Sequence, residues 1–169
     1  MATFIPETID FAETAPVIAE AVGLVSGTPQ EVWTSILDYP RWTQWMGSLK
    51  DCRATSEPAT GIGSTRQVTL TGGLKFQERF IAWDEPNVWA FTGTEGPPIF
   101  ERLVERITIR EVSPGRSQVT YRMAMKPRRG LTPVLKVARK GIEKNLAASL
   151  AALDGVVAAD RAAASTDGA

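Results

Sequence analysis

Hydrophobic and polar positions along this chain follow two different periods. In several short runs, apolar side chains alternate with polar ones, as they do in a strand with one buried face. Glycine, proline and aspartate separate most of these runs, and no helical pattern lies between the last six. Regular turns without crossover helices favour antiparallel pairing, so we expect one antiparallel sheet. The predicted strands cover residues 17–25, 49–55, 64–70, 74–83, 88–94, 100–112 and 117–125.

Two short helices are expected between the first and second strands. Thr28 is a suitable N-cap, Pro29 suits the first helical position, and Glu31 completes a capping box. The next proline ends this helix. A second short helix then follows, and it carries Trp42 and Trp45 on one side.

The helical period returns at residue 132 and continues at least to residue 153. The apolar stripe of this last helix is narrow, and it includes the small residues Ala138, Gly141 and Ser149. A helix that packs closely on a sheet usually presents larger side chains. We therefore expect an α+β fold in which a curved antiparallel sheet wraps around this helix, with a cavity between them. That cavity is where we expect the function to be located.

The length of the chain favours a single domain. A chain of 169 residues can bury a substantial core. Residues 1–15 are polar and interrupted by proline, so we expect an N-terminal arm with little structure of its own. The predicted domain covers residues 16–158. We expect residues 159–169, which are small and polar, to form a disordered tail.

Composition restricts the chemistry of the chain. Nineteen basic and nineteen acidic residues cancel, which gives no overall attraction to nucleic acid. No apolar run is long enough to span a bilayer, and the first residues do not resemble a secretory signal. The single cysteine, Cys52, cannot form an intramolecular disulfide, so we expect a cytoplasmic protein. Without histidine, the chain lacks the usual nucleophile pairs and metal ligands, and we expect neither a metal nor a cofactor.

Turn geometry predicts which residues face one another across the sheet. If the hairpin at residues 72–73 has a three-residue loop, apolar residues of the two strands face one another, with Val68 opposite Phe76. A two-residue loop would instead oppose apolar and charged residues. In the favoured register, Arg66 lies opposite Glu78 on the apolar, inner face of the sheet.

The same reasoning predicts the register of the later hairpins. It places Phe80 beside Phe91 and Ala82 beside Trp89. Apolar residues of the next two strands also meet: Leu103, Ile107 and Ile109 lie near Met125, Tyr121 and Val119.

A polar row is therefore expected to cross the apolar inner face. Arg66 and Glu78 belong to it, Glu101 and Glu105 also point inward, and Gly93 leaves a gap beside them. Buried charges are costly unless they are paired. An inward pair of this kind is typical of a polar anchor in a small-molecule pocket. A purely structural ion pair remains an alternative.

These patterns predict a ligand-binding cavity. The aromatic and aliphatic residues that would line it are equally compatible with the ordinary hydrophobic core, and the sequence does not separate the two roles. The candidate ligand-binding residues are Trp42, Trp45, Arg66, Glu78, Trp89, Phe91, Glu101, Glu105, Tyr121, Met123 and Ile142.

A basic edge lies beside the last helix. It consists of the segment Lys126-Pro-Arg-Arg-Gly together with Lys136, Arg139 and Lys140. Such an edge fits a weak contact with an anionic membrane surface or with an acidic ligand tail. A solvated charged face is the alternative.

The segment SGTPQEVWTSILDYPRWTQWM, followed by hairpins and a long terminal helix, resembles the START-like or Bet v 1-like helix-grip superfamily. Within it, residues 17–157 are most similar to the bacterial polyketide cyclase/dehydrase and lipid-transport family. The resemblance implies a seven-stranded curved antiparallel sheet that grips the C-terminal helix, with two short helices between strands 1 and 2. It also implies a deep hydrophobic cavity.

The resemblance implies three classes of function. Members bind lipids, sterols or hormones, act as aromatase/cyclases, or serve as interaction modules. Aromatase/cyclases carry a Ser-x-Arg on the third strand, which Ser64-Thr65-Arg66 resembles, although Ile62 stands where an aromatic residue is expected. In an enzyme, Arg66 would stabilise an enolate-like oxygen and Glu78 would orient it or move a proton. Our leading hypothesis is binding or transport of a small, mostly hydrophobic ligand, lipid-like or polyketide-like. The sequence does not indicate the oligomeric state.

Overall fold

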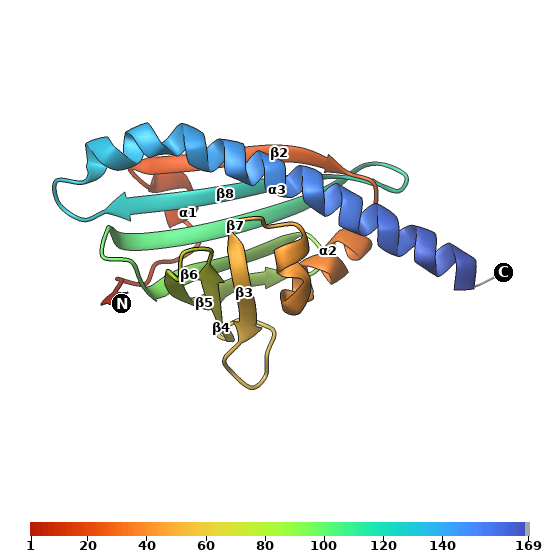
Figure 1. Cartoon of the computed structure of the whole chain (residues 1–169), viewed down its shortest axis with the longest axis horizontal. Helices are drawn as coiled ribbons and strands as arrows, with labels where there is room; N and C mark the ends of the chain where they lie inside the picture. Colours follow the sequence, from red (N-terminus) through yellow and green to blue (C-terminus); the bar gives the residue numbers. More distant parts are fainter. Residues whose placement is uncertain (168–169) are drawn as a thin grey trace.

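A curved antiparallel sheet dominates the computed structural model, which describes residues 1–167 (Figure 1). Its main path follows the order β2-β8-β7-β6-β5-β4-β3, so the seven predicted strands and their antiparallel pairing are confirmed. The strands are β2 (Val17–Val25), β3 (Leu49–Ala54), β4 (Thr65–Leu70), β5 (Lys75–Asp84), β6 (Val88–Gly96), β7 (Phe100–Ser113) and β8 (Arg116–Pro127).

The two helices expected after the first strand are present as α2 (Pro29–Leu37) and the 3-10 helix η1 (Tyr39–Gln44). The capping box of α2 is confirmed: the Thr28 backbone N–H donates to the Glu31 carboxylate at 2.6 Å, and the Thr28 side chain accepts from the Glu31 backbone. In η1, the Trp42 indole donates to the Ile36 carbonyl at 2.7 Å. This bond fixes η1 against α2 at one end of the sheet.

The predicted register is confirmed at most positions. Arg66 lies opposite Glu78, and Phe80 lies opposite Phe91. The prediction that Ala82 lies beside Trp89 is wrong, because an irregularity after Phe80 shifts the ladder by one residue. A bulge changes which residues oppose one another without changing the neighbouring strands. The pairs predicted between the next two strands are confirmed: Leu103, Ile107 and Ile109 lie opposite Met125, Tyr121 and Val119.

The N-terminal arm is ordered, contrary to the sequence-based expectation. Its strand β1 (Ala2–Thr3) pairs with the end of β6, where β6 has separated from β7. The Phe4 N–H donates to the Thr94 carbonyl, and the Ile5 N–H donates to the Glu101 carbonyl, both at 2.9 Å. The arm therefore bridges a split between two neighbouring strands.

Phe4 fills the gap that was expected at Gly93. Its side chain is only 2% exposed, and a Cβ added at Gly93 would lie 2.8 Å from its ring. The ring also contacts Phe76 and Phe100 in edge-on geometry. Further along the arm, helix α1 (Phe11–Thr14) buries Ala12 on the outer face of β7 and β8.

The C-terminal helix α3 (Thr132–Asp167) lies along β2 and is longer than predicted (Figure 1). The disordered tail expected for residues 159–169 is therefore wrong for residues 159–167, whereas residues 168–169 lie outside the described part. The alanine-rich sequence of residues 159–167 favours helix. Arg41 forms a salt bridge with Asp160 at 2.9 Å, which anchors the C-terminal part of α3 to η1. A Cβ added at Gly23 would lie 2.8 Å from Leu150, so the glycine allows the helix to approach β2 closely.

Candidate ligand-binding cavity

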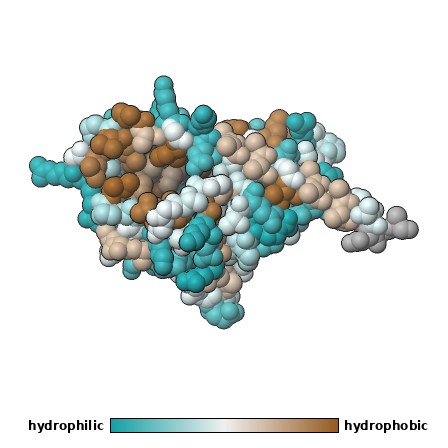
Figure 2. Space-filling view, viewed as in Figure 1, coloured by the Kyte–Doolittle hydropathy of each residue, from teal (hydrophilic) through white to brown (hydrophobic). Residues whose placement is uncertain are grey.

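A cavity of about 460 Å³ lies between α3 and the inner face of the sheet. Figure 2 shows its opening as a hollow bordered by hydrophobic residues, beside the N-terminal half of α3. Leu74 and Ile99 line the cavity and are about half exposed, so they lie at the mouth. Most of the wall is apolar: Trp42, Met46, Leu49, Val68, Leu70, Phe76, Pro97, Phe100, Met123, Ala138, Gly141, Ile142 and Leu146.

The predicted pairing of Arg66 with Glu78 is confirmed. The Arg66 Nε donates to Glu78 Oε2 at 2.6 Å, and both side chains are almost fully buried. Burial alone would lower the pKa of the guanidinium, but the Glu78 carboxylate beside it raises that pKa above its ordinary value. Arg66 therefore stays charged inside the protein, at the wall of the cavity.

Five aromatic rings surround the Arg66 guanidinium. The nearest are Trp42, Trp89 and Phe91, with ring centroids 4.1, 4.5 and 4.8 Å from Cζ, and Tyr39 and Phe80 complete the set. A cation that faces aromatic rings is stabilised by their quadrupoles, more strongly when it is desolvated. The rings therefore supply part of the stabilisation that Arg66 loses by leaving water.

Only some of the aromatic residues predicted to line the cavity do so. Trp42 lines the cavity as expected. Trp89 and Phe91 do not line it, because they lie behind Arg66 and hold its guanidinium. Trp45 is buried against Trp42, with ring centroids 4.5 Å apart, and belongs to the core.

Arg66 has a nitrogen that remains free to donate hydrogen bonds to a ligand. Its Nε binds Glu78, and its Nη1 donates weakly to the Cys52 sulfur at 3.8 Å. Among residues 1–167, Nη2 makes no hydrogen bond. Since Arg66 lines the cavity, Nη2 is the nitrogen with both N–H groups left for an oxygen atom of a bound molecule.

A second polar pair borders the same cavity. Tyr121 donates its hydroxyl proton to Glu105 Oε2 at 2.5 Å, and both side chains line the cavity. Burial, together with the Glu78 charge, raises the pKa of Glu105 to about 7. Burial also raises the pKa of Tyr121, so its hydroxyl stays protonated. Near neutral pH the Glu105 carboxyl can thus accept or donate a hydrogen bond to a ligand.

Glu101 does not belong to this site, which corrects the sequence-based prediction. The ladder between β7 and β8 is irregular between Phe100 and Arg102. Glu101 therefore turns away from the cavity and pairs with Lys126 at 3.0 Å. The polar row consists of Arg66, Glu78 and Glu105 alone.

Ser64 also lies outside the cavity wall. Its hydroxyl donates to the Gly61 carbonyl at 2.7 Å, in the turn before β4. The remaining candidates, Met123 and Ile142, line the cavity. Sequence reasoning did not single out several residues that also line it, although the alternation in β4 and β5 had placed two of them inward. These residues are Met46, Ser48, Leu49, Val68, Leu70, Leu74, Phe76, Pro97, Ile99, Phe100, Asn145 and Leu146.

The raised pKa of Glu105 makes stability depend on pH. The ordinary pKa of the carboxyl is 4.5, so between that value and about 7 the folded protein holds a proton that the unfolded chain releases. The stability contributed by this group is complete below pH 4.5 and is lost as the pH rises through about 7. Glu105→Gln cannot ionise at this position. We therefore expect its free energy of unfolding, relative to that of the parent protein, to be higher at about pH 8 than at about pH 5. Urea denaturation at both pH values measures this difference, and an equal difference at both would contradict the raised pKa.

The match to a family model decides the relationship of this fold to known proteins. Residues 17–158 match the model described as polyketide cyclase / dehydrase and lipid transport. The chain belongs to this family. An uncharacterized protein of Mycobacterium tuberculosis (strain ATCC 25618 / H37Rv) is 28% identical over 132 residues, which cover 78% of each chain. An uncharacterized protein of Mycobacterium bovis matches to the same extent.

Two solved structures share this helix-grip fold. The aromatase/cyclase Zhui from Streptomyces sp. R1128 superposes with a TM-score of 0.70 at 16% identity, over 83% of this chain and 93% of that one. A START superfamily protein from Mycobacterium smegmatis gives a TM-score of 0.68 at 15% identity, over 83% and 96%. At this level of identity the likeness concerns the fold. The predicted START-like fold is thereby confirmed.

Two further structural observations concern possible sites. Within residues 1–167, no three His, Cys, Asp or Glu side chains are grouped to hold a metal ion. No helix of this part of the chain combines the length and the apolar character needed to cross a bilayer.

Proposed function

We propose that this protein binds or transports a small, mostly hydrophobic molecule that carries one polar, oxygen-containing end. The observation that carries the proposal is an apolar cavity of about 460 Å³ with a buried, charged arginine in its wall. Small-molecule sites in proteins have this volume and this mixture of apolar walls and few polar groups. The description of the family, which includes lipid transport, supports the same class of ligand.

The polar groups suggest how such a ligand would be oriented. Arg66 Nη2 would donate to a carbonyl or carboxylate oxygen. Glu105, with its pKa near neutrality, would add a second hydrogen bond, and Tyr121 would hold its carboxyl in place. The apolar body of the ligand would extend toward the mouth, between Phe76 and Ile142.

Two other functions receive less support from the geometry. An aromatase/cyclase that used Ser64 with Arg66 would need both side chains in one cavity, but the Ser64 hydroxyl is bound to the Gly61 carbonyl outside it. An interaction module in which side chains fill the interior is at odds with a cavity of about 460 Å³. We therefore retain ligand binding as the proposal.

A pair of glycine variants in one helix tests the cavity. Gly141 lines it, whereas Gly155 lies on the same helix away from it, and a Cβ at either position meets no atom within 4 Å. Gly141→Leu should place a side chain in the opening and weaken binding of 8-anilinonaphthalene-1-sulfonate, an apolar probe with an anionic end, by roughly tenfold. Gly155→Leu is the control and should bind the probe like the parent protein. Fluorescence titration measures both affinities.

The outcomes separate a cavity site from binding elsewhere. If both variants bind the probe equally well, the probe does not use this cavity and the proposed site is wrong. Native mass spectrometry of the protein purified from its host would show a bound molecule directly. We expect any molecule retained by the parent protein to be lost from Gly141→Leu and kept by Gly155→Leu.

A further inference from the structure

The mouth of the cavity opens through an exposed apolar surface. Leu74 and Ile99 are 53% and 45% exposed on one side of the mouth, and Val134 and Val137 are 64% and 82% exposed on α3. We call the surface formed by these four residues the mouth face. Figure 2 shows hydrophobic residues around the hollow on this side of the molecule.

The helical spacing explains why α3 contributes an apolar edge here. Val134 lies three residues before Val137 and four before Ala138, and Gly141 lies four residues after Val137 and three after Ala138, so the four share one side of the helix. Ala138 and Gly141 line the cavity, and the two valines continue from them into solvent. Exposed valines beside an apolar opening form a contiguous apolar surface, and such a surface bordered by polar residues is typical of a contact site.

Basic side chains surround the mouth face. Between residues 126 and 144, one acidic residue accompanies a cluster of lysines and arginines, although the whole chain has equal numbers of both charges. Lys126 pairs with Glu101, and Arg139 pairs with Glu143. In the described part of the chain, the other basic residues near the mouth form no salt bridge: Lys75, Arg128, Arg129, Lys136, Lys140 and Lys144.

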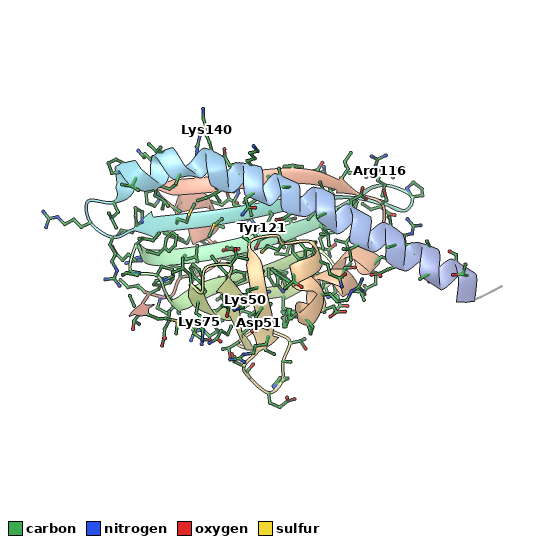
Figure 3. The ribbon with its side chains drawn as sticks, in the orientation of Figure 1. Lys50, Asp51, Lys75, Arg116, Tyr121 and Lys140 are labelled. Atoms are coloured by element: carbon green, nitrogen blue, oxygen red, sulfur yellow. The ribbon has the colours of Figure 1, made fainter. Side chains whose placement is uncertain are left out.

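These basic residues lie on both sides of the opening. Figure 3 shows Lys140 projecting outward from α3, and Lys75, at the start of β5, in the part of the sheet that lies away from α3 in this view. Arg128 lies next to the mouth, because its N–H donates to the Ile99 carbonyl at 2.9 Å. An apolar centre with a positively charged border complements a bilayer that has an apolar interior and anionic headgroups.

We infer that the mouth face docks on an anionic lipid bilayer, an interaction that ligand binding by itself does not require. In this position the cavity would open into the acyl-chain region. A poorly soluble ligand could then enter or leave without crossing water. Val134 and Val137 would insert among the lipids, while Lys140 and Lys144 would remain at the headgroups.

Vesicle flotation tests the docking surface. We expect the parent protein to float with vesicles of phosphatidylcholine mixed with phosphatidylglycerol, much less with phosphatidylcholine alone, and less as salt is added. Lys140→Gln combined with Lys144→Gln should lower the partition coefficient by about fivefold for each charge at low ionic strength. Val134→Glu combined with Val137→Glu should abolish flotation.

The chain offers a matched control. Val22 and Leu24 are 55% and 49% exposed on β2, on the side away from α3. Val22→Glu combined with Leu24→Glu makes the same chemical change at similar exposure and should leave flotation unchanged. None of these substituted residues lines the cavity, so we expect every variant to keep its affinity for 8-anilinonaphthalene-1-sulfonate in solution.

Several results would overturn the inference. Equal flotation with both kinds of vesicle would show that charge has no part in docking. Absence of flotation with intact probe binding would remove the docking surface and leave the proposed function standing. Light scattering after size-exclusion chromatography would expose another occupant: a dimer that dissociates in the Val134→Glu, Val137→Glu variant would assign the mouth face to a second copy of the chain.

Discussion

Glu78→Ala should lower the free energy of unfolding by about 3–5 kcal/mol, because it leaves a buried arginine without its carboxylate. Arg66 is 1% exposed, and Glu78 accepts its Nε hydrogen bond at 2.6 Å. The surrounding aromatic rings stabilise the cation but do not neutralise it. Urea denaturation at neutral pH measures the loss. Glu101→Ala is the control, since it removes a glutamate from a partly exposed ion pair and should change the stability far less.

A double substitution separates the structural role of the pair from its role toward a ligand. Arg66→Met combined with Glu78→Leu replaces both charges by apolar groups and should recover most of the stability lost in Glu78→Ala. We expect this variant to bind a long-chain alkane like the parent protein and to lose its preference for the corresponding carboxylic acid. A preserved preference would show that the pair is structural and that the polar end is held at Glu105.

Phe4→Ala should also be severely destabilising, by about 3–5 kcal/mol, because Phe-to-Ala changes in a core leave a cavity. The ring fills the space above two glycines: a Cβ would lie 2.8 Å from it at Gly93 and 2.6 Å from it at Gly96. It also supports Phe76 and Phe100, which line the cavity. Thermal and urea denaturation measure the loss. We expect weaker probe binding as well, since the wall loses its support.

The neighbouring residue provides the comparison for Phe4. Ile5 is 46% exposed, and only its backbone bonds to the sheet. Ile5→Ala should therefore change the free energy of unfolding far less than Phe4→Ala. If the two variants were equally stable, the arm would not close the split between β6 and β7.

The local features of the fold followed from the sequence because each depends on residues that are near in the chain. The capping box needs only Thr28 and Glu31, three residues apart. The facing of Arg66 and Glu78 depends on one hairpin, in which alternation and loop length leave one register with matching faces. These elements, with the strand order of a meander and the last helix, were enough to predict the fold class and the position of the cavity.

The distribution of residues around the cavity depended on tertiary structure. Irregular pairing after Phe80 and after Phe100 displaced Ala82 from Trp89 and turned Glu101 outward. Such bulges bend a strand to follow the curvature of the whole sheet, so reasoning from two strands alone does not predict them. The aromatic enclosure of Arg66 likewise joins rings from η1, β5 and β6, which meet only when the sheet curves around them.

The N-terminal arm shows most clearly what could not be predicted from the sequence alone. Residues 1–15 carry no strong period, so the sequence alone indicated an unstructured segment. In the folded protein, β6 and β7 diverge, and their unpaired backbone groups and the bare surface at Gly93 receive the arm and Phe4. That binding surface exists only after the sheet has formed. The sequence by itself thus determined the elements and their local register, whereas the curvature of the sheet decided which side chains face the cavity and which support it from behind.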